Sequence, residues 1–174
     1  LESIPNLDTR QFQCNGSITV DNNEITCLSH HGAITMQEGL AKSCNIVFAE
    51  LAMELGAEKM TAMAEKMGFG QSFEVDGIPT SVSQYNVDGA TQNELGWSGI
   101  GQYTDTVNPC HMAILMGAIA NGGTPVIPYY VGSVSGPFGF PLHRGHPTWG
   151  DELVDETLAG KLEALLRYDV TSDY

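Results

Sequence analysis

The segment that most constrains the fold is the apolar stretch NPCHMAILMGAIANGG at residues 108–123. Asn108 is a preferred residue immediately before a helix, and Pro109 is favoured at the first helical position. The stretch stays apolar as far as Asn121 and then reaches two glycines, which predicts a helix over residues 108–121. Because this helix has no polar face, we expect it to be the most buried helix of the chain.

Four further helices are predicted from apolar periodicity and from residues that begin or end helices. Thr35 and Glu38 match a capping box and begin a short helix through about Lys42. Gly56 is expected to end the next helix. The other three helices are predicted at residues 46–55, 58–67 and 153–168. The expected fold class is therefore mainly α, with a small irregular or hairpin part at the N-terminus.

The charge balance excludes some classes of partner. Seven basic residues face 21 acidic ones, which gives a net charge of −14. Nucleic acid needs basic side chains to neutralise phosphates, so a nucleic-acid partner is not expected. The same balance argues against a patch that binds anionic lipid.

Two of the four cysteines flank a predicted hairpin. Cys14 and Cys27 enclose two short extended segments around an Asp-Asn-Asn turn. In an oxidising compartment a bridge between them would contribute about 3 kcal/mol by loop-closure entropy. The alternative is a zinc site that adds His30 and His31 to the two thiols. Cys44 and Cys110 lie in apolar helical contexts and are expected to be buried free thiols.

Small polar residues interrupt the apolar pattern at Ser43-Cys44-Asn45. All three are poor helix formers, and they lie where one predicted helix ends and another begins. Two interpretations remain open from the residues alone: the triplet caps the helix that starts at Ile46, or it faces a pocket and takes part in chemistry.

The surroundings of this triplet match a family. The stretch HHGAITMQEGLAKSCNIVFAELAMELG resembles the second motif region of penicillin-binding protein transpeptidases, in which a Ser-x-Asn triplet lies between two helices. The stretch GIGQYTDTVNPCHMAILMGAIANGG resembles the family segment that reads GQG…TPLQMA…AIANGG. Asn108 stands where the family usually has Thr, and Cys110-His111 stand where it has Leu-Gln. The resemblance implies the helical subdomain of an α+β fold like that of transpeptidases and β-lactamases.

The resemblance also implies a catalytic role for the triplet. Family members attack a D-Ala-D-Ala carbonyl with a serine, and the leaving amine must receive a proton. By this resemblance, Ser43 passes that proton, and Asn45 binds the substrate carbonyl or steadies the catalytic lysine. No cofactor and no metal are implied.

The other two family motifs do not occur in the chain. No serine is followed by lysine three residues later, and no Lys-Thr-Gly or Lys-Ser-Gly is present. The opening Leu1-Glu2 resembles the end of the helix that carries the nucleophile, so we expect Ser-x-x-Lys just before residue 1. We likewise expect the Lys-Thr-Gly strand just after residue 174. Residues 1–174 are thus expected to be a partial transpeptidase domain that is inactive alone.

For the whole protein the resemblance implies cross-linking of peptidoglycan stem peptides and binding of β-lactams. It implies a place on the outer side of the bacterial cell membrane, with an anchor that is not in this chain. The helix face that packs on the missing sheet is expected to cause self-association of the isolated piece. Two alternatives stay open: a non-catalytic helical binding or scaffold module derived from the same fold, and a sensor-type β-lactamase relative.

Overall fold

The structure, a computed structural model, describes residue 1 and residues 3–172. Glu2, Asp173 and Tyr174 lie outside the described residues. Two expectations fall partly on them: that Leu1-Glu2 ends the helix that carries the nucleophile, and that the last residues lead toward a Lys-Thr-Gly strand. The described part contains five helices: α1 (Met36–Ala41), α2 (Asn45–Lys66), α3 (Gln92–Ser98), α4 (Pro109–Ala120) and α5 (Glu156–Thr171).

The described residues also contain ten short strands, which pair as five separate antiparallel two-stranded sheets. The pairs are β1 (Phe12–Cys14) with β4 (Gly32–Ile34), β2 (Ser17–Val20) with β3 (Asn23–Thr26), β5 (Glu74–Val75) with β6 (Ile78–Pro79), β7 (Val126–Ile127) with β10 (Thr148–Trp149), and β8 (Ser133–Ser135) with β9 (Pro141–Arg144). The expectation of a mainly α fold is therefore wrong: the fold is mixed α/β. Strands of two to four residues are too short to show a clear alternating pattern, and two of the pairs join segments distant in sequence.

The predicted N-terminal hairpin is present as β2 and β3. Asp21 and Asn22 link the strands, and both have positive φ values, 51° and 61°. Positive φ at both central residues defines the type I′ turn, whose twist matches that of the flanking strands. Aspartate and asparagine tolerate this backbone better than most residues, so the local sequence explains the hairpin.

The helices begin where their capping residues predict. Thr35 and Glu38 form the complete capping box of α1. Thr91 and Glu94 form the same box at α3, a helix that the sequence analysis missed although TQNE repeats the spacing of TMQE. The Asn108 side chain caps α4, with proline at the first helical position.

One long element replaces two of the predicted helices. Residues 46–55 and 58–67 were expected to be separate, and α2 covers both with a kink at Gly56, where φ is 81°. A positive φ is favourable for glycine, so this residue sets the kink. The predicted helix at 153–168 is observed as α5, which begins later because Asp155 caps it.

The main core lies around the first half of α2. Ile46, Val47 and Ala49 are fully buried there, against apolar residues of β1, β3 and β4. On the other side α3 crosses α2 closely. A Cβ added to Gly99 would lie 2.3 Å from the Cβ of Ala52, so only glycine permits this approach.

The prediction that the 108–121 helix is the most buried is wrong. In α4 only His111, Ile114 and Ala118 are buried. Met112 and Met116 keep 40% and 44% of their surface exposed. Within the described residues, α4 packs chiefly against α5 and β7, and the buried His111 joins it to Met67 at the end of α2. An apolar helix is buried only where other elements cover it, and here much of its surface is uncovered.

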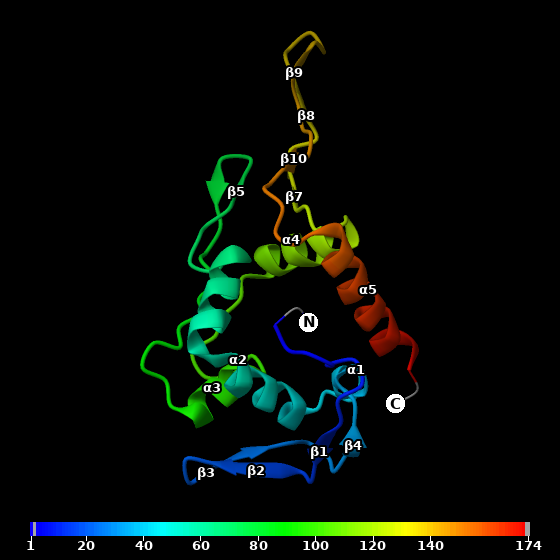
Figure 1. Cartoon of the computed structure of the whole chain (residues 1–174). Helices are drawn as coiled ribbons and strands as arrows, with labels where there is room; N and C mark the ends of the chain where they lie inside the picture. The colour runs from blue at the N-terminus through cyan, green and yellow to red at the C-terminus, as the bar shows by residue number, and fades with distance from the viewer. Residues whose placement is uncertain (2, 173–174) are drawn as a thin grey trace.

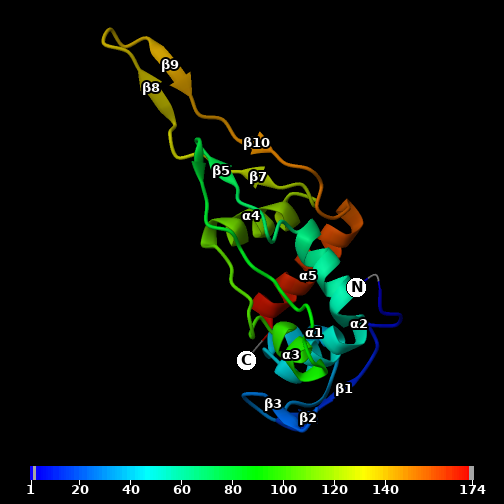
Figure 2. The ribbon, with the colours of Figure 1, turned by 90° about the vertical axis from the view of Figure 1, so that its left-hand side faces the viewer.

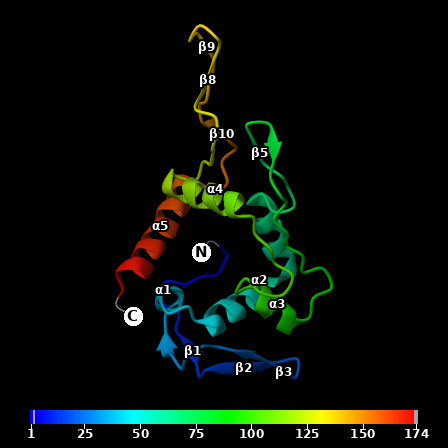
Figure 3. The same ribbon diagram turned by 180° about the vertical axis from the view of Figure 1, so that it is seen from behind.

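The arrangement of the elements follows from these contacts. In Figure 1, α2, α4 and α5 lie along three sides of a triangle, with the N-terminal segment running between them. The β1–β4 and β2–β3 sheets form its base, and α1 packs beside α5. The β8–β9 hairpin projects away from the opposite end, as the side view of Figure 2 and the rear view of Figure 3 also show.

Candidate functional site

The step between α1 and α2 is a tight turn that places Ser43 in a left-handed conformation. The Ser43 N–H donates to the Leu40 carbonyl at 3.0 Å, and the Cys44 N–H donates to the Gly39 carbonyl at 2.8 Å. These two bonds are those of a Schellman motif at the end of α1. Ser43 occupies its left-handed position with φ of 49°, where glycine is the usual residue.

Serine at this position costs free energy that glycine would avoid, roughly 1–2 kcal/mol for a left-handed residue with a Cβ. The Ser43 side chain is exposed, and among the described residues its hydroxyl has no hydrogen-bond partner. The hydroxyl therefore does not stabilise the turn. Strained residues of this kind cluster at functional sites.

Asn45 is held in a different way. It is the first residue of α2, and its side-chain amide donates to the Thr26 carbonyl at 2.8 Å. That carbonyl lies at the end of β3, so the hydrogen bond ties the helix step to the hairpin. In the part of the chain that the structure describes, the amide nitrogen is engaged in this way, whereas no hydrogen bond is made by the side-chain oxygen of Asn45.

The capping interpretation of the triplet does not fit this geometry. Cys44 occupies the N-cap position of α2 and makes no side-chain cap hydrogen bond. Ser43 precedes the cap, and the Asn45 side chain bonds to the hairpin instead. Neither polar side chain of the triplet therefore satisfies the free N–H groups at the start of α2.

The triplet adjoins a cluster of sulfur atoms. Cys14, Cys27, Cys44 and His31 each have a ligand atom within 4.8 Å of those of the other three. The predicted Cys14–Cys27 disulfide is wrong for this structure, in which both thiols are free. Spacing along the chain suggested a pair, but the fold brings in a third sulfur from Cys44.

The ionisation of these thiols differs with their surroundings. Burial raises the pKa of Cys44 to about 12, and the neighbouring sulfurs of Cys14 and Cys27 add to the rise against a hydrogen bond from the Val47 backbone. For Cys27, burial also raises the pKa, but hydrogen bonds from Ser29, Asn45 and the other thiols outweigh it, so its pKa lies below the usual value.

The fourth cysteine, Cys110, and its neighbour His111 are not part of this cluster. Cys110 is free and half-buried rather than fully buried. His111 is buried, and its Nε2 donates to the Met67 carbonyl at 2.8 Å. Its Nδ1 lies 2.7 Å from the Ser83 hydroxyl, which can either donate to it or accept from it. Both ring nitrogens thus have hydrogen-bond partners, so His111 joins α4 to α2 and the loop at Ser83.

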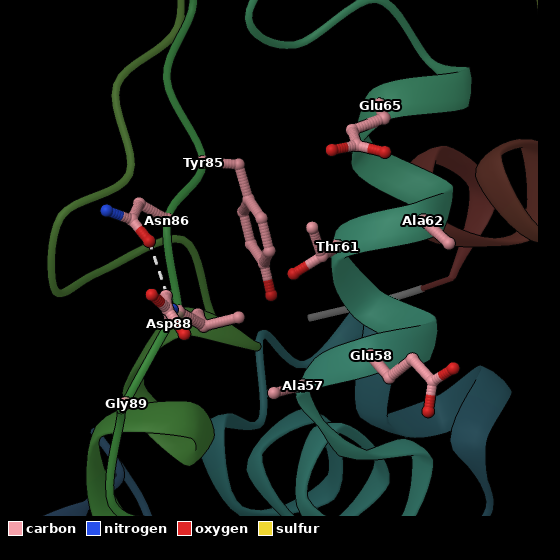
Figure 4. Close-up of a pocket in the computed structure, with 10 residues that line it drawn as sticks. Ala57, Glu58, Thr61, Ala62, Glu65, Tyr85, Asn86, Asp88 and Gly89 are labelled. Atoms are coloured by element: carbon pink, nitrogen blue, oxygen red, sulfur yellow. Dashed lines mark hydrogen bonds between the residues drawn. The ribbon is translucent and has the colours of Figure 1, made fainter.

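A hollow of about 490 Å³ lies elsewhere, between the second half of α2 and residues 85–89 (Figure 4). Its rim carries the carboxylates of Glu58, Glu65 and Asp88. Burial raises the pKa of the Tyr85 hydroxyl, which remains neutral at physiological pH. Neither Ser43 nor Asn45 lines this hollow, so the hollow and the triplet are separate features.

Comparison with protein families and curated proteins gives one consistent match. A family model described as penicillin binding protein transpeptidase domain matches residues 6–174. "Peptidoglycan D,D-transpeptidase PbpA" from Mycolicibacterium smegmatis is 38% identical over 108 residues, which cover 60% of this chain and 21% of that protein. The chain thus spans about a fifth of the length of the curated relatives it matches.

Solved structures agree with the sequence matches. The D,D-transpeptidase domain of a peptidoglycan glycosyltransferase from Eggerthella lenta is 28% identical, with a TM-score of 0.83 over 95% of this chain and 44% of that one. Penicillin-binding protein A from Mycobacterium tuberculosis, solved as a penicillin G acyl-enzyme complex, is 23% identical, with a TM-score of 0.83 over 94% of this chain and 39% of that one. The second likeness concerns the fold alone. Across the described residues, no helix has the length and apolar character needed to cross a bilayer.

Proposed function

Because the chain belongs to the penicillin-binding protein transpeptidase family, we propose that residues 1–174 are part of a peptidoglycan D,D-transpeptidase that cross-links stem peptides by serine acyl transfer. The relatives named as D,D-transpeptidases support this activity. The description of the family as penicillin binding supports β-lactams as a second class of ligand. Peptidoglycan lies outside the cytoplasmic membrane, so the site acts there.

Within that activity, Ser43 relays a proton and Asn45 positions the substrate. When the nucleophilic serine attacks the peptide carbonyl, the leaving amine must gain a proton from a group within hydrogen-bond reach. The single observation that carries this role is the free, exposed hydroxyl of Ser43, held in a conformation that glycine would adopt at lower cost. The side-chain oxygen of Asn45 is available to a lysine or a substrate N–H, because its amide nitrogen already bonds to Thr26.

The nucleophile itself comes from outside residues 1–174, since the chain has no Ser-x-x-Lys. Lys42 adjoins Ser43, but neighbouring residues point in different directions, so Lys42 is not placed to take the proton of Ser43. Residues 1–174 alone therefore do not react with penicillin. The exposed apolar side of α4, with Met112 and Met116, makes the isolated piece self-associate.

A fluorescent penicillin tests these roles on the whole protein and on residues 1–174. We expect label on the whole protein only. Ser43→Ala in the whole protein should slow acylation about 100-fold or more, the usual contribution of a positioned proton donor. Ser81→Ala, at another exposed serine, is the matched control and should acylate normally.

Two outcomes would contradict the proposal. A covalent adduct on Ser43 would make it the nucleophile and not the relay. An unlabelled whole protein without Ser-x-x-Lys would instead favour a non-catalytic binding module built on this fold.

A further inference from the structure

Four potential metal ligands meet next to the Ser43–Asn45 step. They come from three parts of the chain: position 14, positions 27 and 31, and position 44. Cys14 ends β1, Cys27 follows β3, His31 precedes β4, and Cys44 lies between α1 and α2. Pairing of β1 with β4 sets Cys14 opposite Gly32, next to His31. The Cys27 N–H donates to the Gly16 carbonyl at 2.7 Å, which holds the end of the hairpin at the same place.

The spacing of these atoms is that of a tetrahedral site. The sulfurs of Cys27 and Cys44 are 4.0 Å apart, and the Cys27 sulfur is 3.6 Å from Nδ1 of His31. Zinc bonds of about 2.3 Å to sulfur and about 2.0 Å to nitrogen give tetrahedral edges of roughly 3.8 Å and 3.5 Å. All four ligand atoms lie within 4.8 Å of one another, so a small closure brings each to bonding distance.

We propose that Cys14, Cys27, His31 and Cys44 bind one structural zinc ion that fixes the Ser43–Asn45 step. Three thiolates and one imidazole form a common ligand set of structural zinc sites. With four protein ligands the site is closed, so the ion holds the fold and does not activate water. Binding of the metal does not rest on the proposed transpeptidase activity, whereas its effect on Ser43 does.

The chemistry of the cluster favours a cation over free thiols or a disulfide. Cys14 and Cys44 are 1% and 0% exposed, so ionising them without a counter-charge is unfavourable. A bound dication compensates the thiolates, and each thiol releases its proton to solvent as the metal binds. A disulfide between any two of the three cysteines leaves the third unpaired and gives His31 no role.

The position of Cys44 links the ion to the triplet. Ser43 and Asn45 are its immediate neighbours, and Asn45 also bonds to Thr26, which precedes Cys27. The metal and this hydrogen bond together attach the helix step to the hairpin at two adjacent points. The ion therefore acts as a positioning element for the left-handed Ser43.

Metal content and spectroscopy test the site on the protein purified under reducing conditions. We expect about one zinc ion per chain by elemental analysis and native mass spectrometry. Replacement by Co²⁺ should give the visible d–d bands of a tetrahedral site and a sulfur-to-cobalt charge-transfer band. Neither readout depends on penicillin, so failure of the proposed activity would leave this result unaffected.

Matched variants locate the ligands. Cys27→Ser and His31→Ala should each lose the bound zinc or weaken it at least 10-fold. Cys110→Ser and His30→Ala replace the same residue types outside the cluster and should keep full metal content. If the ligand variants do not fold, the cobalt spectrum of the unaltered protein still tests whether three cysteines bind the metal, because the intensity of the charge-transfer band increases with the number of thiolate ligands.

Two results would overturn the proposal. One is a metal-free protein in which the thiols of Cys14, Cys27 and Cys44 are alkylated without chelator. The other is a disulfide between two of them, found by peptide mapping in protein that binds neither zinc nor cobalt. Removal of zinc by a chelator should lower the thermal midpoint of the protein and slow its acylation. A chelator without effect on either would refute the positioning role.

Discussion

The first half of α2 and the whole of α4 are both rich in apolar residues but differ in environment. Most residues of each are apolar, yet Ile46, Val47 and Ala49 are fully buried, whereas Met112 and Met116 are more than a third exposed. The difference lies in what packs against them. Sheets and α3 enclose the first half of α2, whereas α4 packs chiefly against α5 and the short strand β7 and keeps part of its surface uncovered. The apolar composition of a helix thus shows that it can be buried. The elements that pack against it decide which fraction of its surface is buried.

The largest expected difference between these regions concerns side-chain truncation. Ile46→Ala removes a fully buried side chain and should lower the free energy of unfolding by about 4 kcal/mol. Met116→Ala removes a side chain that is already 44% exposed and should cost less than about 1 kcal/mol. Urea unfolding of both variants measures the comparison. Equal losses would mean that α4 is covered in solution.

Adding a methyl group should act in opposite directions in the two regions. Gly99→Ala places a Cβ against Ala52, at the α2–α3 crossing, and should cost about 2–3 kcal/mol. Gly117→Ala in α4 meets no atom within 4 Å and should gain about 0.8 kcal/mol from helix propensity. Thermal unfolding of the two variants, compared with the unaltered protein, measures both effects. A destabilising Gly117→Ala would indicate a close neighbour on that face of α4.

A smaller effect tests whether strain at the start of α2 serves function. Ser43→Gly removes the left-handed strain and should raise the free energy of unfolding by roughly 1 kcal/mol. The same variant should lose the fast acylation of the whole protein, because the hydroxyl is gone. Ser43→Ala, which keeps the strain, separates the two effects. A stabilised variant that acylates normally would remove the catalytic role of Ser43.

The smallest expected effect is a pH dependence within the same half of α2. Burial raises the pKa of Glu50, opposed by Arg10 and reinforced by Glu54. A carboxyl group with a raised folded-state pKa binds its proton more readily when folded. Stability therefore falls as pH rises from the usual value of 4.5 toward the folded-state pKa, and the loss persists at neutral pH.

Glu50→Gln should accordingly stabilise the protein slightly at pH 7, and the gain should vanish below about pH 4. Glu65→Gln, at an exposed position of α2, is the control for the loss of one negative charge from the same helix. Urea midpoints measured across this pH range give the result. A gain for Glu50→Gln that is independent of pH would rule out proton linkage as its cause.

Local signals were enough to predict much of the secondary structure. The Thr35 capping box, the Asn108 cap and the Asp21-Asn22 turn each act through backbone hydrogen bonds within a few residues. The capping box at Thr91 was equally readable and was overlooked. The break at Ser43-Cys44-Asn45 was located from poor helix formers alone, although its catalytic role rests on family resemblance and stays a prediction.

The sequence by itself determined where helices start, where the chain turns, and which residues are apolar enough to be buried, because each of these depends on neighbours along the chain. The tertiary structure decided which residues meet. It placed Cys44 beside Cys14, Cys27 and His31, where the spacing along the chain had suggested either a Cys14–Cys27 bridge or a zinc site with His30 and His31. It also left α4 partly uncovered. Contacts of this kind depend on how distant elements pack, and short-range backbone preferences carry no information about that packing.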